Sequence, residues 1–372
     1  MTKELETTAA PTLQPNVGLD VWGTVKLTLR GEELDYTTGP LGRAILLLSI
    51  PMVLEMAMES VFALTDAFFV SRLGTDGVAT VGLTEAMVTI LFAVAHGLGI
   101  GTTAIIARRI GEKDKPGART AAAQAILLGL VVSAAFAIPG VVFARDLLGA
   151  MGGSPELVAS GHGFTRVIFG GCGTIVLLFL LNAVFRGAGD AAIAMRVLWI
   201  ANAVNIVLDP CLIFGLGPFP EMGITGAAVA TTVGRGIGVA VQLYVLFFGG
   251  SRIRIAIRHL APRVRVMIRL FRLSVGGMLQ TVISHSSWLV LVWIVGSFGA
   301  AAVAGYTIAI RLVIFALLPS WGLANAAATL VGQNLGAGRP DRAERSAWRA
   351  GILNTVFLLG VAVVFVTAAG PM

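Results

Sequence analysis

Amide and carboxylate side chains stand inside long apolar segments of this sequence. Asn205 and Asp209 are four residues apart in one such segment, so on a helix their oxygens point the same way. Pro210 follows them, removes a helix hydrogen bond and favours a kink. Hard oxygen ligands of this kind suit Na⁺ or a shared proton. The pair therefore predicts a coupling-cation site, and the alternative is a hydrogen bond that only packs helices together.

Three more carboxylates, those of Glu55, Glu59 and Asp66, share another apolar segment. Spacings of four and seven residues place them on one face of a helix. A charge inside the membrane costs roughly 2.5 to 3.5 kcal/mol on insertion scales, so such residues are functional candidates by default. They predict a path for protons or cations into the helix bundle. The alternative is a structural network bonded to neighbouring polar groups.

Other polar residues are candidates for a substrate cavity. We expect Asn182, Glu59 and Asn202 to line it. Asn182 and Thr231 could complete an oxygen-lined pocket, although such residues by themselves commonly join helices.

Two basic side chains also lie inside apolar segments. Histidine is a residue type that can carry protons at physiological pH, and we assign His285 with Glu55 to a proton path, the alternative being a structural core histidine. Arg311 lies deep in another segment, where it either pairs with a carboxylate or extends to the interface, and its role stays open.

The composition decides the class of protein. Of the 372 residues, 56% are hydrophobic and 13% are charged, against about 25% charged in soluble domains. Too little polar surface remains for a soluble enzyme, a disordered chain or a secreted disulfide scaffold. Both cysteines lie in apolar segments, and neither a phosphate-binding loop motif nor a zinc-ligand spacing is present. The sequence predicts a polytopic membrane protein that is not an enzyme and has no cofactor.

Nine apolar segments are long enough to cross about 30 Å of hydrocarbon. Residues 1–40 precede them as a polar tail. The expected spans are 44–72, 79–108, 117–146, 160–187, 191–216, 224–249, 267–298, 301–332 and 342–370.

The loop charges predict the orientation. The net charge is +7, and arginines and lysines gather in alternate loops, which indicates membrane orientation rather than nucleic-acid binding. The most basic loop joins the sixth and seventh spans, whereas the fifth-to-sixth and seventh-to-eighth loops contain neither residue. Under the positive-inside rule the N-terminus is cytoplasmic, and we expect a multi-pass protein of a prokaryotic plasma (inner) membrane.

An internal repeat becomes visible when the chain is shifted by 225 residues without gaps. Gly97 then aligns with Gly322, and Gly111 with Gly336. Six spans separate the copies, so both have the same orientation, as in secondary transporters whose halves are related by an axis along the membrane normal. The second copy ends after three spans, so three more would be expected.

Several motifs together resemble the multidrug and toxic compound extrusion (MATE) family. They are Leu48-Ser49-Ile50-Pro51, Asp66 eight residues before Gly74, Asn205-Ile206-Val207-Leu208-Asp209-Pro210, the stretch Gly223 to Thr231, and Val331-Gly332-Gln333-Asn334-Leu335-Gly336-Ala337. The resemblance implies an all-α membrane fold of two six-helix lobes in parallel repeat, with about nine of the twelve helices present. It implies Na⁺- or H⁺-coupled export of organic cations and other drugs, with a first-lobe cation site at Asp66, Asn205, Asp209 and Thr231.

The sequence departs from the family pattern in its second half. Some branches carry an acidic residue in the seventh span, where this chain has Gln280 and His285. The difference favours coupling in the first lobe, as in the DinF-like, Na⁺-driven branch. We expect a cytoplasmic tail at 1–40, an N-lobe at 41–250, a basic cytoplasmic linker at 251–266 and an incomplete C-lobe at 267–372.

The predicted function is cation-coupled antiport by alternating access. The expected partners are small, cationic amphiphilic substrates and membrane lipid, with no nucleic acid, and the full-length protein is expected to be a monomer. Two alternatives stay open: a lipid-linked saccharide flippase of the same superfamily, and an uncoupled channel or membrane scaffold. The flippase would need a cationic groove, for which the spans offer chiefly Arg311. The channel or scaffold leaves Asp66 and the Asn205–Asp209 pair without a role.

Overall fold

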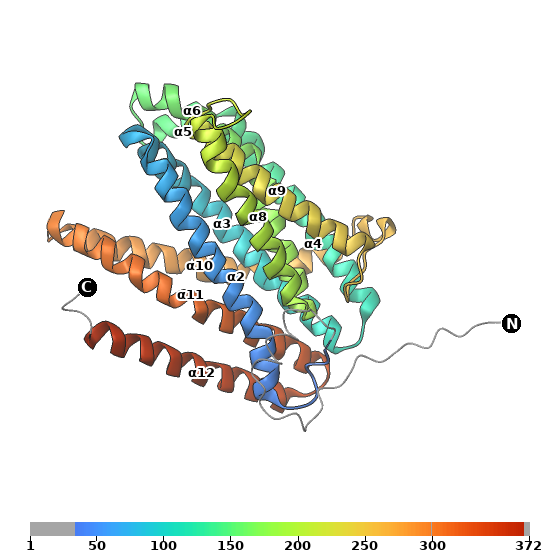
Figure 1. Cartoon of the computed structure of the whole chain (residues 1–372). Helices are drawn as coiled ribbons and strands as arrows, with labels where there is room; N and C mark the ends of the chain where they lie inside the picture. The colour runs from blue at the N-terminus through green and yellow to red at the C-terminus, as the bar shows by residue number, and fades with distance from the viewer. Residues whose placement is uncertain (1–33, 299, 368–372) are drawn as a thin grey trace.

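The computed structural model describes residues 34–298 and 300–367, without the side chains of Arg311 and some neighbouring residues between 289 and 315. All regular structure in these ranges is helical (Figure 1). The helices are α2 (Leu41–Ser71), α3 (Gly74–Gly111), α4 (Lys115–Val142), α5 (Ala144–Ala150), α6 (Pro155–Gly170), α7 (Cys172–Ala188), α8 (Ala191–Phe214), α9 (Ile224–Phe248), the short η1 (Ile257–Leu260), α10 (Val264–Gly296), α11 (Ala300–Gly336) and α12 (Pro340–Thr367).

The predicted all-α polytopic fold is confirmed. Among the described residues, eight segments are long and apolar enough to cross a membrane, and α6 and α7 together form one of them. The expected span 301–332 lies within α11, which is 37 residues long. The expected third and fourth spans are each interrupted by a break between two helices in the structure. Phe143 separates α4 from α5, and Gly171 separates α6 from α7.

The ends of these helices follow local sequence signals. Ser154 accepts a hydrogen bond from the backbone N–H of Leu157, and Pro155 begins α6. Asp114 caps α4 in the same way through the N–H of Gly117. Such caps satisfy backbone groups that would otherwise be unpaired at the helix ends, so the connections between spans can be short.

The helices form two groups (Figure 1). Helices α2 to α9 form one group, and α10 to α12 lie obliquely beside it. We call the end where α3 leads into α4, α9 into α10 and α11 into α12 the basic end, because its loops contain the arginine clusters. The two groups lie close together at the basic end and separate toward α5, α6 and the start of α11 (Figure 1).

Small residues allow close contact between the groups, and these contacts follow the 225-residue repeat. A Cβ added to Gly97 would collide with Met278, and one added to Gly322 would collide with Val53. Gly97 and Gly322 are counterparts in the repeat, and so are Val53 and Met278, so the second contact repeats the first. Gly332 packs against Ala107, and these two residues are each other's counterparts in the repeat, so the pseudo-twofold axis passes between them. Glycine permits this approach because it has no side chain to separate the backbones.

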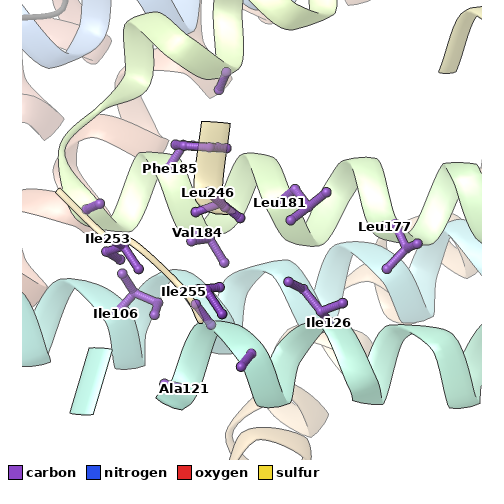
Figure 2. Close-up of a cluster of buried hydrophobic side chains, with 14 of the residues drawn as sticks. Ile106, Ala121, Ile126, Leu177, Leu181, Val184, Phe185, Leu246, Ile253 and Ile255 are labelled. Carbon is purple, nitrogen blue, oxygen red and sulfur yellow. The ribbon is translucent and has the colours of Figure 1, made fainter. Parts of the chain in front are cut away.

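A large apolar cluster supports the basic end of the first group. Its side chains come from α3, α4, α7, α8 and α9, and they include Ile106, Ile126 and Phe185 (Figure 2). Ile253 and Ile255, from the linker after α9, are each 2% exposed within it. These two buried side chains therefore attach the linker to the first group of helices. Buried Gln124 reinforces this anchor by donating to the carbonyls of His259 and Ala261.

Candidate functional site

The three carboxylates of α2 share one face but have different partners. Glu55 is 1% exposed, and its Oε1 accepts hydrogen bonds from Nη1 of Arg186 and Nδ2 of Asn182, both at 3.1 Å. Oδ1 of Asn182 in turn accepts from Nε2 of buried Gln242 at 2.5 Å. Oε2 of Glu55 and Oε1 of Gln242 have no partner among the described residues. These contacts are those expected of a structural network, and the assignment of Glu55 to a proton path stays a prediction.

Arg186 therefore has a role that was not predicted from the sequence. It lies at the end of the expected span 160–187, in the last turn of α7, and its side chain is only 12% exposed. The overlooked signal is its spacing, because Asn182 lies four residues earlier and shares its helix face. An arginine here neutralises a carboxylate that burial alone would strongly destabilise.

Glu59 lies one turn further along α2 and faces α8. Its Oε2 accepts a hydrogen bond from Nδ2 of Asn202 at 3.2 Å. Nearby, the indole N–H of Trp199 donates to the carbonyl of Leu54 at 3.1 Å. The structure thus brings together two of the predicted cavity residues, Glu59 and Asn202, whereas it places Asn182 in the network around Glu55.

The predicted cation site is formed by α8 and α9. Asn205 donates from Nδ2 to the hydroxyl of Thr231 at 3.2 Å, and its Oδ1 has no hydrogen-bond partner among the described residues. Asp209 is 0% exposed, and neither of its carboxylate oxygens has a hydrogen-bond donor among the described residues. Three buried acceptor oxygens without donors are an arrangement that a bound cation or a proton would satisfy.

Asp66 is half-buried on α2 and faces the same region, where its charge interacts with that of Asp209. Two further charges lie there that were not predicted from the sequence. Glu85 on α3 and Arg235 on α9 both interact electrostatically with Asp66. Each is a charged residue in a predicted span, which was the available signal. The site is therefore a cluster of mixed charge rather than a set of carboxylates alone.

Arg235 also has aromatic neighbours. Its guanidinium carbon lies 5.6 Å from the ring centroid of Phe62 and 5.9 Å from that of Phe92. A guanidinium at such distances is attracted by the ring faces. Two aromatic rings and one cation thus lie beside the carboxylate cluster.

No hydrogen bond or ion pair joins His285 to the carboxylates of α2 among the described residues. His285 is exposed on α10, and its Nδ1 lies 2.8 Å from the carbonyl oxygen of Thr281. Arg311 is outside the described side chains. Within the described part of the chain, no three His, Cys, Asp or Glu residues gather as metal ligands, so an ion at Asp209 would also rely on Asn205 and Thr231.

The basic end is closed by residues 34–40, which we call the strap. They belong to the expected tail, yet Leu34 and Tyr36 are 6% and 4% exposed. Arg252 donates to the carbonyls of Ala188, at 2.9 Å, and Leu34. Burial raises the pKa of the Tyr36 phenol to about 12, against the opposing charge of Arg252. The phenol therefore stays protonated and donates to the carbonyl of Gly189.

The strap also binds the second group of helices. Arg339 donates to the carbonyl of Thr37 at 2.6 Å, and Arg342 donates to that of Thr38 at 3.1 Å. Beside the strap, Gln333 of α11 donates directly to the carbonyl of Gly187 at 3.1 Å. Both groups of helices are thus held together at this end by hydrogen bonds as well as by glycine packing.

Comparison with known proteins agrees with this architecture. The MatE family model matches residues 51–211 and 278–372. A protein named FAD transporter, from Shewanella oneidensis, is 28% identical over 309 residues, which are 83% of this chain and 68% of that protein. The multidrug export protein MepA of Staphylococcus aureus (strain MSSA476) is 24% identical over 314 residues, 84% of this chain and 68% of that protein.

A solved structure gives the same result. It is described as the outward-facing conformation of a multidrug resistance MATE family transporter of the MOP superfamily. It superposes with a TM-score of 0.84 and 29% identity, covering 90% of this chain and 74% of that chain. Since the family model alone matches more than half of the residues, this chain belongs to the MatE family and is a multi-span membrane transporter, not an enzyme.

Proposed function

We propose that this protein is an antiporter that exports small organic molecules in exchange for Na⁺ or H⁺. The observation that carries the proposal is Asp209, a buried carboxylate that receives no hydrogen bond from any described residue, beside the Oδ1 of Asn205, which has no described partner either. An uncompensated buried charge is costly, so the site is stable only when a cation or proton occupies it. This need for an ion is the property that coupling requires.

The coupling site comprises Asp66, Asn205, Asp209 and Thr231. In this proposal the ion is held by Asp209 and Asn205, while Thr231 orients the amide by accepting its N–H. Asp66 adds a second negative charge nearby. One elementary charge moving through 100 mV releases about 2.3 kcal/mol, which supports a substrate gradient of more than tenfold.

The positive-inside rule supports placing the basic end in the cytoplasm of a bacterial inner membrane. The close glycine contacts between the two groups then lie on the cytoplasmic half, so the structure represents a state open to the outside. In alternating access, ion binding at Asp209 changes the charge between α2 and α8, Pro210 allows α8 to bend, and the substrate leaves. Binding of the next substrate favours ion release and closure.

The first candidate substrate class is cationic and amphiphilic. Glu59, Asp66 and Glu85 supply negative charge, and Phe62 and Phe92 supply ring faces in the same region. Cations are attracted to both kinds of group.

Arg235 favours a second candidate class, aromatic molecules that carry an anionic group. A guanidinium binds phosphate or carboxylate, and the neighbouring rings would stack on an aromatic system. The relative named FAD transporter makes a flavin nucleotide a suitable test molecule of this class.

The test is transport in proteoliposomes with an imposed Na⁺ or H⁺ gradient. Wild-type protein should drive ethidium or flavin adenine dinucleotide across the membrane, and Asp209→Asn should lower the gradient-dependent rate at least tenfold, a change of about 1.4 kcal/mol. Asp76→Asn is the matched control, because Asp76 is exposed at the start of α3. Transport by Asp209→Asn at the wild-type rate would overturn the proposal. Arg235→Gln should impair the flavin nucleotide more than ethidium if the second substrate class is correct.

A further inference from the structure

A cavity with an unusual lining lies at the basic end, beside the start of α12. Its volume is about 500 Å³. Half of the eight residues around it are arginines, and the full lining is Leu41, Gly338, Arg339, Pro340, Asp341, Arg342, Arg345 and Arg349. No step of the proposed transport cycle uses it.

The four arginines form one stripe. Arg339 directly precedes α12, and the other three lie within it. Spacings of three, three and four residues place Arg339, Arg342, Arg345 and Arg349 along the same side of the helix. The same stretch contains two acidic residues, Asp341 and Glu344, yet none of these side chains forms an ion pair among the described residues. The cavity therefore has an excess of positive charge.

The arginines differ in what they already bind. Arg339 and Arg342 are anchored, because they donate to carbonyls of the strap. The Nε of Arg342 is nevertheless buried and has no partner in the described part of the chain. Arg345 and Arg349 are exposed, and no hydrogen bond to another described residue occupies them. Two fixed and two free guanidiniums thus surround one cavity, and donors remain available for an acceptor that the described residues do not supply.

The geometry points to a binding site for a phosphate group in this cavity. A planar guanidinium donates two parallel hydrogen bonds to phosphate oxygens, so a set of arginines recognises phosphate better than a simple point charge would. Leu41 adds an apolar wall. A phosphate monoester or diester is the ligand class that matches these donors.

The position favours a phospholipid headgroup as the source of the phosphate, and this step rests on the proposed cytoplasmic orientation of the basic end. Trp348, next to the stripe, is 67% exposed and borders an adjoining hollow formed with Arg345 and Arg349. Exposed tryptophan and arginine at a helix end are typical of the membrane interface, and basic pockets between membrane helices bind anionic headgroups. Inorganic phosphate from the cytoplasm is the other source.

Occupancy would strengthen the closed basic end. The four like charges repel one another, and a bound phosphate removes that repulsion next to Arg339 and Arg342, which hold the strap. We therefore expect the ligand to stabilise the closed arrangement of the two groups of helices.

The test compares the full chain in nanodiscs of phosphatidylcholine with and without phosphatidylglycerol, and in detergent with inorganic phosphate. The test variant is the double substitution Arg345→Gln and Arg349→Gln. The control is Arg265→Gln with Arg269→Gln, which removes two exposed charges near the same end of the molecule but outside the cavity. Melting temperature and lipid retained after purification, by mass spectrometry, are the readouts.

Phosphatidylglycerol should raise the melting temperature of the wild type and of the control. Its affinity for the test variant should fall about tenfold or more, since both substitutions remove a charged donor to the phosphate. If inorganic phosphate alone reproduces the rise, the phosphate site stands and free phosphate is its ligand. Equal loss in both double variants, or no rise in the wild type with either ligand, would overturn the site. Transport is not a readout, so this result is independent of the antiport proposal.

Discussion

Glu55 and Asp209 are equally buried, at 1% and 0% exposure, but have opposite surroundings. Glu55 has Arg186 and Asn182 as donors, whereas both oxygens of Asp209 lack one in the described part of the chain. Burying a charge is tolerated when it is paired and is costly when it is not. A counter-charge and hydrogen-bond donors, rather than the extent of burial, therefore distinguish a structural carboxylate from a candidate ion site.

The largest expected effect comes from removing the counter-charge of Glu55. Arg186→Gln would leave Glu55 buried without its counter-charge and should cost about 3 to 5 kcal/mol in the free energy of unfolding. Denaturation in detergent measures this loss. Arg166→Gln, an exposed arginine on α6, is the matched control, and adding Glu55→Gln to Arg186→Gln should recover part of the stability. Unchanged stability of Arg186→Gln would mean that the ion pair is not what holds Glu55.

Asp209, which has no donor among the described residues, should respond to a bound ion instead. At a hundredfold excess over its Kd, Na⁺ would stabilise the wild type by about 2.7 kcal/mol, and Asp209→Asn should abolish this. The measurement is the melting temperature against Na⁺, with N-methylglucamine holding the ionic strength constant. Asp76→Asn should behave as the wild type does. A Na⁺-specific rise that persists in Asp209→Asn would contradict the assigned site, and a rise only with falling pH would assign the role to protons.

A smaller effect is expected at the strap, where the charge of an arginine is stabilised by hydrogen bonds to backbone carbonyl groups. Arg252→Gln removes donors to Leu34 and Ala188 and should weaken the closed basic end by about 1.5 kcal/mol, the lower value for a charged hydrogen bond, because the side chain is half-exposed. Spin labels on Ser71 and Ser297, with both native cysteines replaced, report the separation at the opposite end. The share of short distances should rise.

The control for this experiment is Arg254→Gln, whose exposed side chain donates to Phe247 and not to the strap. An equal change in the distance distributions of Arg252→Gln and Arg254→Gln would show that net charge at this end, and not the strap, governs closure.

The smallest effect is expected at Glu59. Its carboxylate has one amide donor, so its surroundings are intermediate between those of Glu55 and Asp209. Glu59→Gln keeps an acceptor for Asn202, so the unfolding free energy should change by less than about 1 kcal/mol. Binding of a cationic dye should weaken more than binding of a neutral one, as measured by fluorescence titration. A large loss of stability would place Glu59 with Glu55 as a structural carboxylate.

The sequence predicted the helices well because their signals are local. Apolar length marked the spans, and the matching glycines Gly97 and Gly322 marked the repeat before any contact was known. The i, i+4 spacing of Asn205 and Asp209 also placed two oxygens on one helix face. Phe143 and Gly171 were missed as breaks, since nothing in an apolar run requires a helix to end there.

The partners of the buried charges were beyond the sequence. Arg186 is 131 residues from Glu55, and Arg235 of α9 reaches the region of Asp66 of α2. Which helices become neighbours depends on packing over the whole bundle, and spacing within one helix carries no such information.

By itself, the sequence determined that this is a helical membrane protein with an internal repeat and with carboxylates inside its spans, because hydrophobicity and periodicity act within each segment. The arrangement of the helices in space gives Glu55 a counter-charge, leaves Asp209 without a donor among the described residues, and lets the strap close the basic end. The physical reason is that the cost of a buried charge depends on its neighbours in space, and in this chain those neighbours come from distant helices.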